Sequence, residues 1–168
     1  FDYMSRFHAS QNMRYIYYSG SMRGGKEDPP QDTFIYDTKL KQEIAIDNPH
    51  PRVDDTAFSP DSTMLARVFN IGIHESNFGF RRHGPYEIVI NYLDQRKEVR
   101  YEIPGAFMTK QGYRITDLKW SPDSTAIFLS VIAPPNDKFI KFTLLTKEFK
   151  AIQGRYQLST NDMKDYGP

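Results

Sequence analysis

The sequence has 168 residues, 22 of them basic and 21 acidic, for a formal net charge of +1. Hydrophobic residues make up 39% and charged residues 26%, which is typical of a globular domain and excludes a disordered chain. The charge balance argues against a nucleic-acid-binding protein, no apolar run is long enough to cross a membrane, and the lack of cysteine excludes disulfides, thiolate zinc sites and cysteine nucleophiles.

The first part of the chain, about residues 1–48, predicts four short strands. Phe7 precedes a polar turn at Ser10-Gln11-Asn12, and the run Tyr15-Ile16-Tyr17-Tyr18 follows it. A strand, a turn at Thr38-Lys39 and another strand then occupy residues 32–46. Aromatic and β-branched residues around polar turns favour such hairpins.

The next part, about residues 52–104, contains the string FSPDST at 58–63. A strand, a turn at Asp94-Gln95 and another strand follow at 86–103. In the string, Pro60 presets φ for the second position of a tight turn, and Asp61 tolerates the third position and can bond back to the backbone.

The third part, about residues 113–153, repeats this order with WSPDST at 120–125 and a strand–turn–strand at 138–152. With Phe7 as the first marker, the aromatic residues before the three turns are 51 and then 62 residues apart. Four short strands that recur at such an interval indicate the blade of a β-propeller. We therefore expect an all-β fold of about three four-stranded blades, with residues 154–168 as a tail or the start of another blade.

The pattern Asp-x-x-aromatic-Ser-Pro-Asp resembles the TolB-like (PD40) β-propeller repeat, which is close to WD40-like propellers and to the propellers of prolyl-oligopeptidase peptidases. The resemblance covers about 150 residues in three tandem copies, of which the first lacks the Ser-Pro-Asp turn and carries one extra residue. The family usually has Gly after Ser-Pro-Asp, whereas this chain has Ser62 and Ser124, which we expect to end a type I turn. The resemblance implies a non-catalytic protein-interaction module of the bacterial periplasm or cell envelope.

Three blades are too few for a closed propeller, which usually has four to eight. Open strand edges invite pairing with other chains. We therefore expect the chain to be a fragment of a larger propeller, or to associate with itself or a partner. The start at Phe1 and the end at Gly167-Pro168 favour a fragment.

Long connections at 19–31, 70–85 and 104–113 are expected on one face, where binding groups would sit on a rigid scaffold. The predicted contacts with a protein or peptide partner are all on the second and third of these connections. The alternative is that the aromatic residues pack onto the blades and the arginines are solvated. The six predicted contacts are Phe78, Phe80, Arg81, Arg82, His83 and Phe107.

Asp55 and Asp117 lie three residues before the aromatic markers, at the start of the predicted innermost strands. This places them at the mouth of the central channel, where they would meet a cation or a peptide amine. The alternative is a capping role that holds neighbouring blades in register.

No catalytic motif is present: G-x-S-x-G, H-E-x-x-H and the phosphate-binding loop are all missing from the sequence. We therefore expect no enzyme activity, no cofactor and no metal, and neither nucleic-acid binding nor membrane insertion. One alternative is the propeller of a prolyl-oligopeptidase-type serine peptidase whose catalytic domain lies outside these residues. Another is a lyase or glycan-acting propeller that uses channel carboxylates and histidines.

Overall fold

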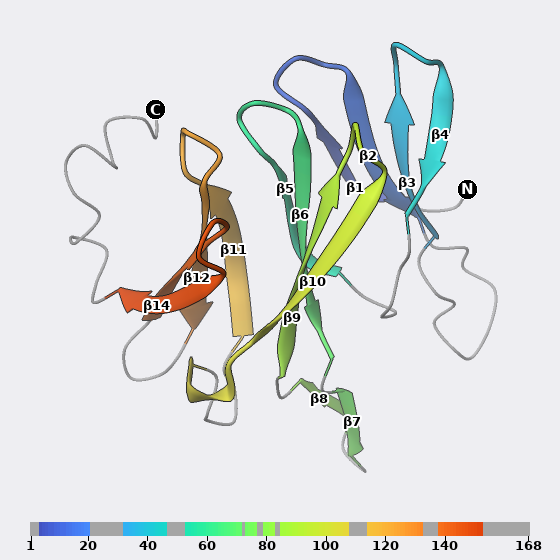
Figure 1. The fold of residues 1–168 in the computed structure, drawn as a ribbon. Helices are drawn as coiled ribbons and strands as arrows, with labels where there is room; N and C mark the ends of the chain where they lie inside the picture. Colours follow the sequence, from blue (N-terminus) through green and yellow to red (C-terminus); the bar gives the residue numbers. More distant parts are fainter. Residues whose placement is uncertain are drawn as a thin grey trace.

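The computed structural model describes residues 4–20, 32–46, 53–71, 73–76, 79–82, 85–107, 114–132 and 138–152. These residues form three four-stranded antiparallel sheets, one after another along the chain (Figure 1). We call them blades 1, 2 and 3.

We call the first strand of each blade its inner strand and the last its outer strand. Blade 1 comprises β1 (Met4–Ala9), β2 (Tyr15–Gly20), β3 (Asp32–Asp37) and β4 (Gln42–Ala45). Blade 2 comprises β5 (Val53–Phe58), β6 (Met64–Asn70), β9 (Tyr86–Tyr92) and β10 (Lys97–Ile103). Blade 3 comprises β11 (Arg114–Trp120), β12 (Ala126–Ile132), β13 (Lys138–Thr143) and β14 (Glu148–Ile152).

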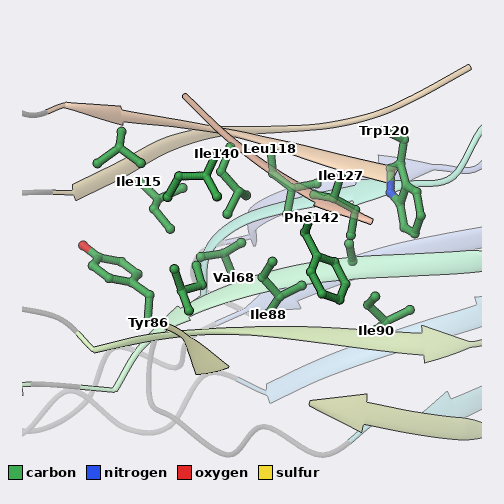
Figure 2. Packing of buried hydrophobic residues seen from close by; sticks show 14 of the residues in the cluster. Val68, Tyr86, Ile88, Ile90, Ile115, Leu118, Trp120, Ile127, Ile140 and Phe142 are labelled. Atoms are coloured by element: carbon green, nitrogen blue, oxygen red, sulfur yellow. The ribbon is translucent and has the colours of Figure 1, made fainter. Parts of the chain in front are cut away.

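The main core lies between blades 2 and 3. Figure 2 shows Val68, Ile88 and Ile90 of blade 2 facing side chains of blade 3 that include Leu118 and Ile127. In β6 the residues at even positions, such as Ala66 and Val68, face blade 3, while Leu65 joins a separate cluster with blade 1. This alternation explains why the whole of β6 is buried, because both of its faces are covered.

Among the described residues, fifteen buried hydrophobic residues form the cluster between blades 2 and 3, against five between blades 1 and 2. Burying one such side chain contributes about 1.5–3 kcal/mol. The joint between blades 2 and 3 is therefore the stronger of the two.

The turns after the three inner strands have the same hydrogen bonds. Ser59 Oγ donates to Asp61 Oδ1 and Ser121 Oγ donates to Asp123 Oδ1, each at 2.6 Å. Burial raises the pKa of Asp61, but hydrogen bonds from Ser59 and Thr63 outweigh burial and lower it overall. The pKa of Asp123 is also lowered, chiefly by the hydrogen bond from Ser121.

The last residue of each inner turn has left-handed backbone geometry. The φ angles are 60° at Ser62, 58° at Ser124 and 58° at Met13. Ser62 and Ser124 end their turns as expected, because their N–H groups donate to the Ser59 and Ser121 carbonyls at 2.8 and 2.9 Å, and a left-handed residue commonly follows such a turn in a hairpin. A left-handed residue favours Gly, which is the residue that the repeat family usually has here.

The structure also corrects the alignment of the first copy. Ser10 Oγ donates to Asn12 Oδ1 at 2.9 Å, as Ser59 does to Asp61. Ala9, which precedes Ser10 directly, therefore stands in the aromatic place, and Phe7 lies two residues earlier. No extra residue separates the inner strand from the turn, and the turn serines are 49 and 62 residues apart.

In blade 2 the short turns lie at the end opposite an extra hairpin (Figure 1). The turns between β5 and β6 and between β9 and β10 lie at the top of Figure 1, and the extra hairpin, β7 (Ile73–Ser76) with β8 (Gly79–Arg82), lies at the bottom. The hairpin connects β6 to β9.

Candidate functional site

The connection at 70–85 is not a plain loop, because the β7–β8 hairpin occupies its centre. His74 is paired with Arg81 and Glu75 with Phe80 across the two strands. Neither IHES nor GFRR alternates polar and apolar residues, so strand periodicity could not have revealed the hairpin. Figure 1 shows the hairpin extending away from the sheet of blade 2.

The predicted partner contacts divide between this hairpin and residues outside the described part. Phe80, Arg81 and Arg82 are three of the four residues of β8. Phe78 and His83 lie outside the described residues. The structure therefore places three of the predicted contacts on one strand of a hairpin.

Phe107 ends the 3₁₀ helix η1 (Gly105–Phe107), which follows β10. Its ring is 6.4 Å from that of Phe149 on β14, centroid to centroid, and the Phe149 ring is 4.6 Å from that of Phe142. Phe107 therefore packs against the edge of the main core, and its role in partner binding stays a prediction.

Asp55 joins blade 2 to blade 3. Its Oδ2 accepts a hydrogen bond of 2.7 Å from the backbone N–H of Leu118, and its Oδ1 accepts one of 2.9 Å from Thr56 N–H. The two inner strands, β5 and β11, lie side by side. This geometry favours the capping role over a ligand at the channel mouth, because both oxygens already accept backbone hydrogens.

Asp117 is the equivalent residue of blade 3. Its side chain is 43% exposed, and its Oδ2 lies 3.1 Å from Lys119 Nζ. Blade 3 has no neighbouring blade on that side among the described residues. Asp55 and Asp117 therefore have different surroundings, although they occupy equivalent positions in their blades.

Sequence reasoning missed three further hydrogen bonds that join the blades. Trp120 Nε1 donates to the Ala57 carbonyl at 2.9 Å. The left-handed serines also act between blades, because Ser124 Oγ accepts from Asp61 N–H and Ser62 Oγ accepts from Asn12 N–H, both at 3.2 Å. Ser62 and Ser124 stand where the repeat family usually has Gly, and this departure was the sequence signal for the two serine contacts.

At the same end, Arg14 connects blade 1 to blade 2. It lies 2.7 Å from Asp94 and 3.2 Å from Asp37, and the Tyr15 hydroxyl also donates to Asp94 at 2.8 Å. Burial raises the pKa of Tyr15, and the bond to Asp94 raises it further. Burial raises the pKa of Asp37 as well, but hydrogen bonds from Leu40 N–H and Arg14 outweigh it and lower that pKa overall.

A fully buried arginine lies on the side of blade 2 that faces blade 1. Arg67 Nε donates to Asn91 Oδ1 at 3.0 Å, and its Nη2 donates to Glu98 Oε2 at 2.9 Å. Asn91 and Arg100 also donate to Glu98. Such a network leaves less room for apolar contact, which agrees with the smaller cluster between these blades.

A groove of about 360 Å³ lies between the outer strands of blades 1 and 2. Ile44 and Ile46 line one side, and Leu93, Arg96 and Lys97 line the other. Glu43 and Glu98 also line the groove, so its apolar walls carry charges of both signs, which is a suitable surface for a peptide. It is a second candidate surface, away from the hairpin.

Within the described residues, no three His, Cys, Asp or Glu side chains lie close enough to hold a metal ion. The same part of the chain contains no helix that could span a membrane.

No protein-family model matches the chain, and the search of curated proteins finds no match. Among solved structures, the β-propeller domain of the Trilobed protease from Pyrococcus furiosus matches 92% of this chain with a TM-score of 0.61 and 16% identity. The match covers 43% of that domain. The chain has a β-propeller fold.

Other propellers match to a similar extent. Dipeptidyl peptidase 4 from Porphyromonas gingivalis gives a TM-score of 0.59 at 12% identity, and TolB from Acinetobacter baumannii gives 0.56 at 14%. Each match covers 92% of this chain but only 26% and 33% of those proteins. The predicted all-β fold with three four-stranded blades is confirmed, and at these identities the likeness shows the fold alone.

Proposed function

We propose that this chain is part of a larger β-propeller that acts as a non-catalytic protein-interaction module. The observation that carries the proposal is the β7–β8 hairpin, which extends from blade 2 at the end opposite its short turns. Its second strand contains one aromatic and two basic residues, Phe80, Arg81 and Arg82. Aromatic residues and arginines are the types enriched at the centres of protein interfaces.

The proposal includes further blades, because three blades leave two open sheet faces and closed propellers usually have four or more. It also includes a location in the bacterial periplasm or cell envelope, which rests on the resemblance of the repeat to TolB-like propellers.

The partner surface is tested with peptides selected on the wild-type chain from a random display library. The enriched peptide is titrated against the double variant Phe80→Ala/Arg82→Ala. We expect its Kd to rise at least about tenfold, as for the loss of an aromatic and an arginine anchor, with an unchanged thermal midpoint.

The matched control is Arg96→Ala/Lys97→Ala, which removes two basic residues from the groove between blades 1 and 2. It should leave the Kd unchanged. An unchanged Kd in the hairpin variant would contradict the proposed surface. A Kd that rises only in the control variant would show that the peptide binds in the groove instead.

A further inference from the structure

The hydrogen bonds across the joint between blades 2 and 3 are not symmetric, because the two blades contribute different groups. Blade 2 contributes two hydrogen-bond acceptors and one backbone donor, and blade 3 contributes the matching two donors and one hydroxyl acceptor. The three pairs are Asp55 with Leu118, Ala57 with Trp120, and Asp61 with Ser124. The partners in each pair are 63 residues apart, so the two blades keep one register across the joint. The bond from Asn12 N–H to Ser62 Oγ repeats the third pair between blades 1 and 2.

Blade 3 carries the same three groups at the equivalent positions on its other side. They are the Asp117 carboxylate, the Lys119 carbonyl and the Asp123 N–H, which follow Asp55, Ala57 and Asp61 by 62 residues each. The Asp117 carboxylate is 43% exposed and is joined to Lys119, itself 57% exposed. An exposed ion pair of this kind is worth little and is easily replaced.

The open side of blade 3 also offers apolar surface. Phe128 and Phe139 alternate with the buried core residues of β12 and β13, so they face away from blade 2. Both are only partly buried, and Lys141 Nζ lies 5.6 Å from the centre of the Phe128 ring. An incoming sheet would cover these rings, as blade 3 covers Val68 and Ile88 of blade 2.

We infer that the open side of blade 3 is a joint for one further propeller blade, which is bound by the Asp117 carboxylate, the Lys119 carbonyl and the Asp123 N–H. This rests on the proposed larger propeller. The incoming blade must supply a strand N–H, an indole two residues later and a hydroxyl residue four residues after the indole, as Leu118, Trp120 and Ser124 do.

Blade 1 of a second copy fits this joint poorly. Its equivalents of Leu118, Trp120 and Ser124 are Phe7, Ala9 and Met13. It has the strand N–H but neither the indole nor the hydroxyl, and the Met13 side chain, 62% exposed, would stand where the hydroxyl is needed. The chemistry therefore favours a further blade of the longer polypeptide over a second copy of this chain.

The experiment extends the full 168-residue chain at its C-terminus by a second copy of residues 104–152, which carries the complete pattern. We expect one cooperative unfolding transition with a higher thermal midpoint. Asp117→Asn in the original copy should lower the midpoint by about 3 °C or more in the extended chain and have little effect in the unextended chain. Ser124→Ala in the appended copy should also lower it.

The matched control extends the chain by residues 1–46, which lack the indole and the hydroxyl, and should give no rise. Three results would overturn the joint: an appended blade that remains open to proteolysis, an equal effect of Asp117→Asn in both chains, or an equal rise with the control. A dimer of the unextended chain that Asp117→Asn dissociates would make the second copy the occupant. Peptide binding by the hairpin is measured separately, so failure of the joint and failure of the proposed function are distinguishable.

Discussion

Asp55 Oδ2 and the backbone N–H of Leu118 are 2.7 Å apart, although 63 residues separate them in the chain. This bond crosses from one blade to the next at the inner strands. A carboxylate that accepts a buried backbone hydrogen has an effect on stability that an exposed carboxylate lacks.

Asp55→Ala should destabilise the chain by about 1–3 kcal/mol, because it leaves the Leu118 N–H without its acceptor. Asp117→Ala removes the equivalent residue, but only an exposed pair with Lys119, and should cost less than about 1 kcal/mol. Urea unfolding followed by circular dichroism measures both. Equal losses in the two variants would show that Asp55 does not join the blades.

Met13→Gly should stabilise the chain by about 1 kcal/mol, because Met13 has a left-handed φ of 58° and its side chain is exposed. Ser62→Gly relieves the same backbone strain but removes the hydroxyl that accepts from Asn12 N–H, so the two effects should nearly cancel. The difference between the two variants in urea unfolding measures the contact. If both variants gained equally, the hydroxyl would contribute nothing.

Acid should weaken the inner turns of blades 2 and 3. The pKa values of Asp61 and Asp123 are lowered from 3.8 by their hydrogen bonds. A lowered pKa in the folded state stabilises the protein above the unfolded value, and this stabilisation is lost as the pH falls below 3.8 through the folded values.

Asp61→Asn/Asp123→Asn should reduce this loss and keep the turns, because Asn12 makes the equivalent bonds with Ser10 and Arg14 N–H in blade 1. The thermal midpoint is measured from pH 6 down to about pH 2. If the double variant were as sensitive to acid as the wild type, the effect would come from other carboxylates. Asp37, whose pKa is also lowered, would then be the first of these to substitute.

Trp120→Phe should cost about 1 kcal/mol, since it keeps an aromatic ring in the core and leaves the Ala57 carbonyl without the indole N–H. Chemical unfolding by circular dichroism measures this loss. Trp120 is the sole tryptophan, so its fluorescence also reports on the joint between blades 2 and 3. If the Trp120→Phe variant were as stable as the wild type, water would be replacing the indole N–H as the donor to the Ala57 carbonyl.

The fold was predictable because the turn residues and the strand periods agree in three copies. The two SPDST strings identified equivalent turns, and the hairpins at 32–46, 86–103 and 138–152 have the predicted strand order. The first copy was misaligned because Phe7 is aromatic and Ala9 is not. Side-chain hydrogen bonds, rather than residue type, identify its turn.

The contacts between blades were less predictable, because they join residues far apart in sequence. The buried Arg67 reads as a surface residue until Asn91 and Glu98 are placed beside it. Asp55 and Asp117 are the same in sequence, yet only Asp55 has a neighbouring blade among the described residues. Sequence periodicity gives the position of each residue in its own blade, whereas its partner depends on the next blade.

The ordered pairing of Asp55 with Leu118 and of Asp61 with Ser124 has a consequence for symmetry. A twofold dimer formed through the open side of blade 3 would place the same patch of both copies in contact, with the same two acceptors and one donor on each side. Neither patch supplies the indole and the hydroxyl that Trp120 and Ser124 supply to blade 2, so this surface disfavours an isologous contact. Assembly through it must be heterologous, with every added unit in the same orientation, and it stops only when a ring closes.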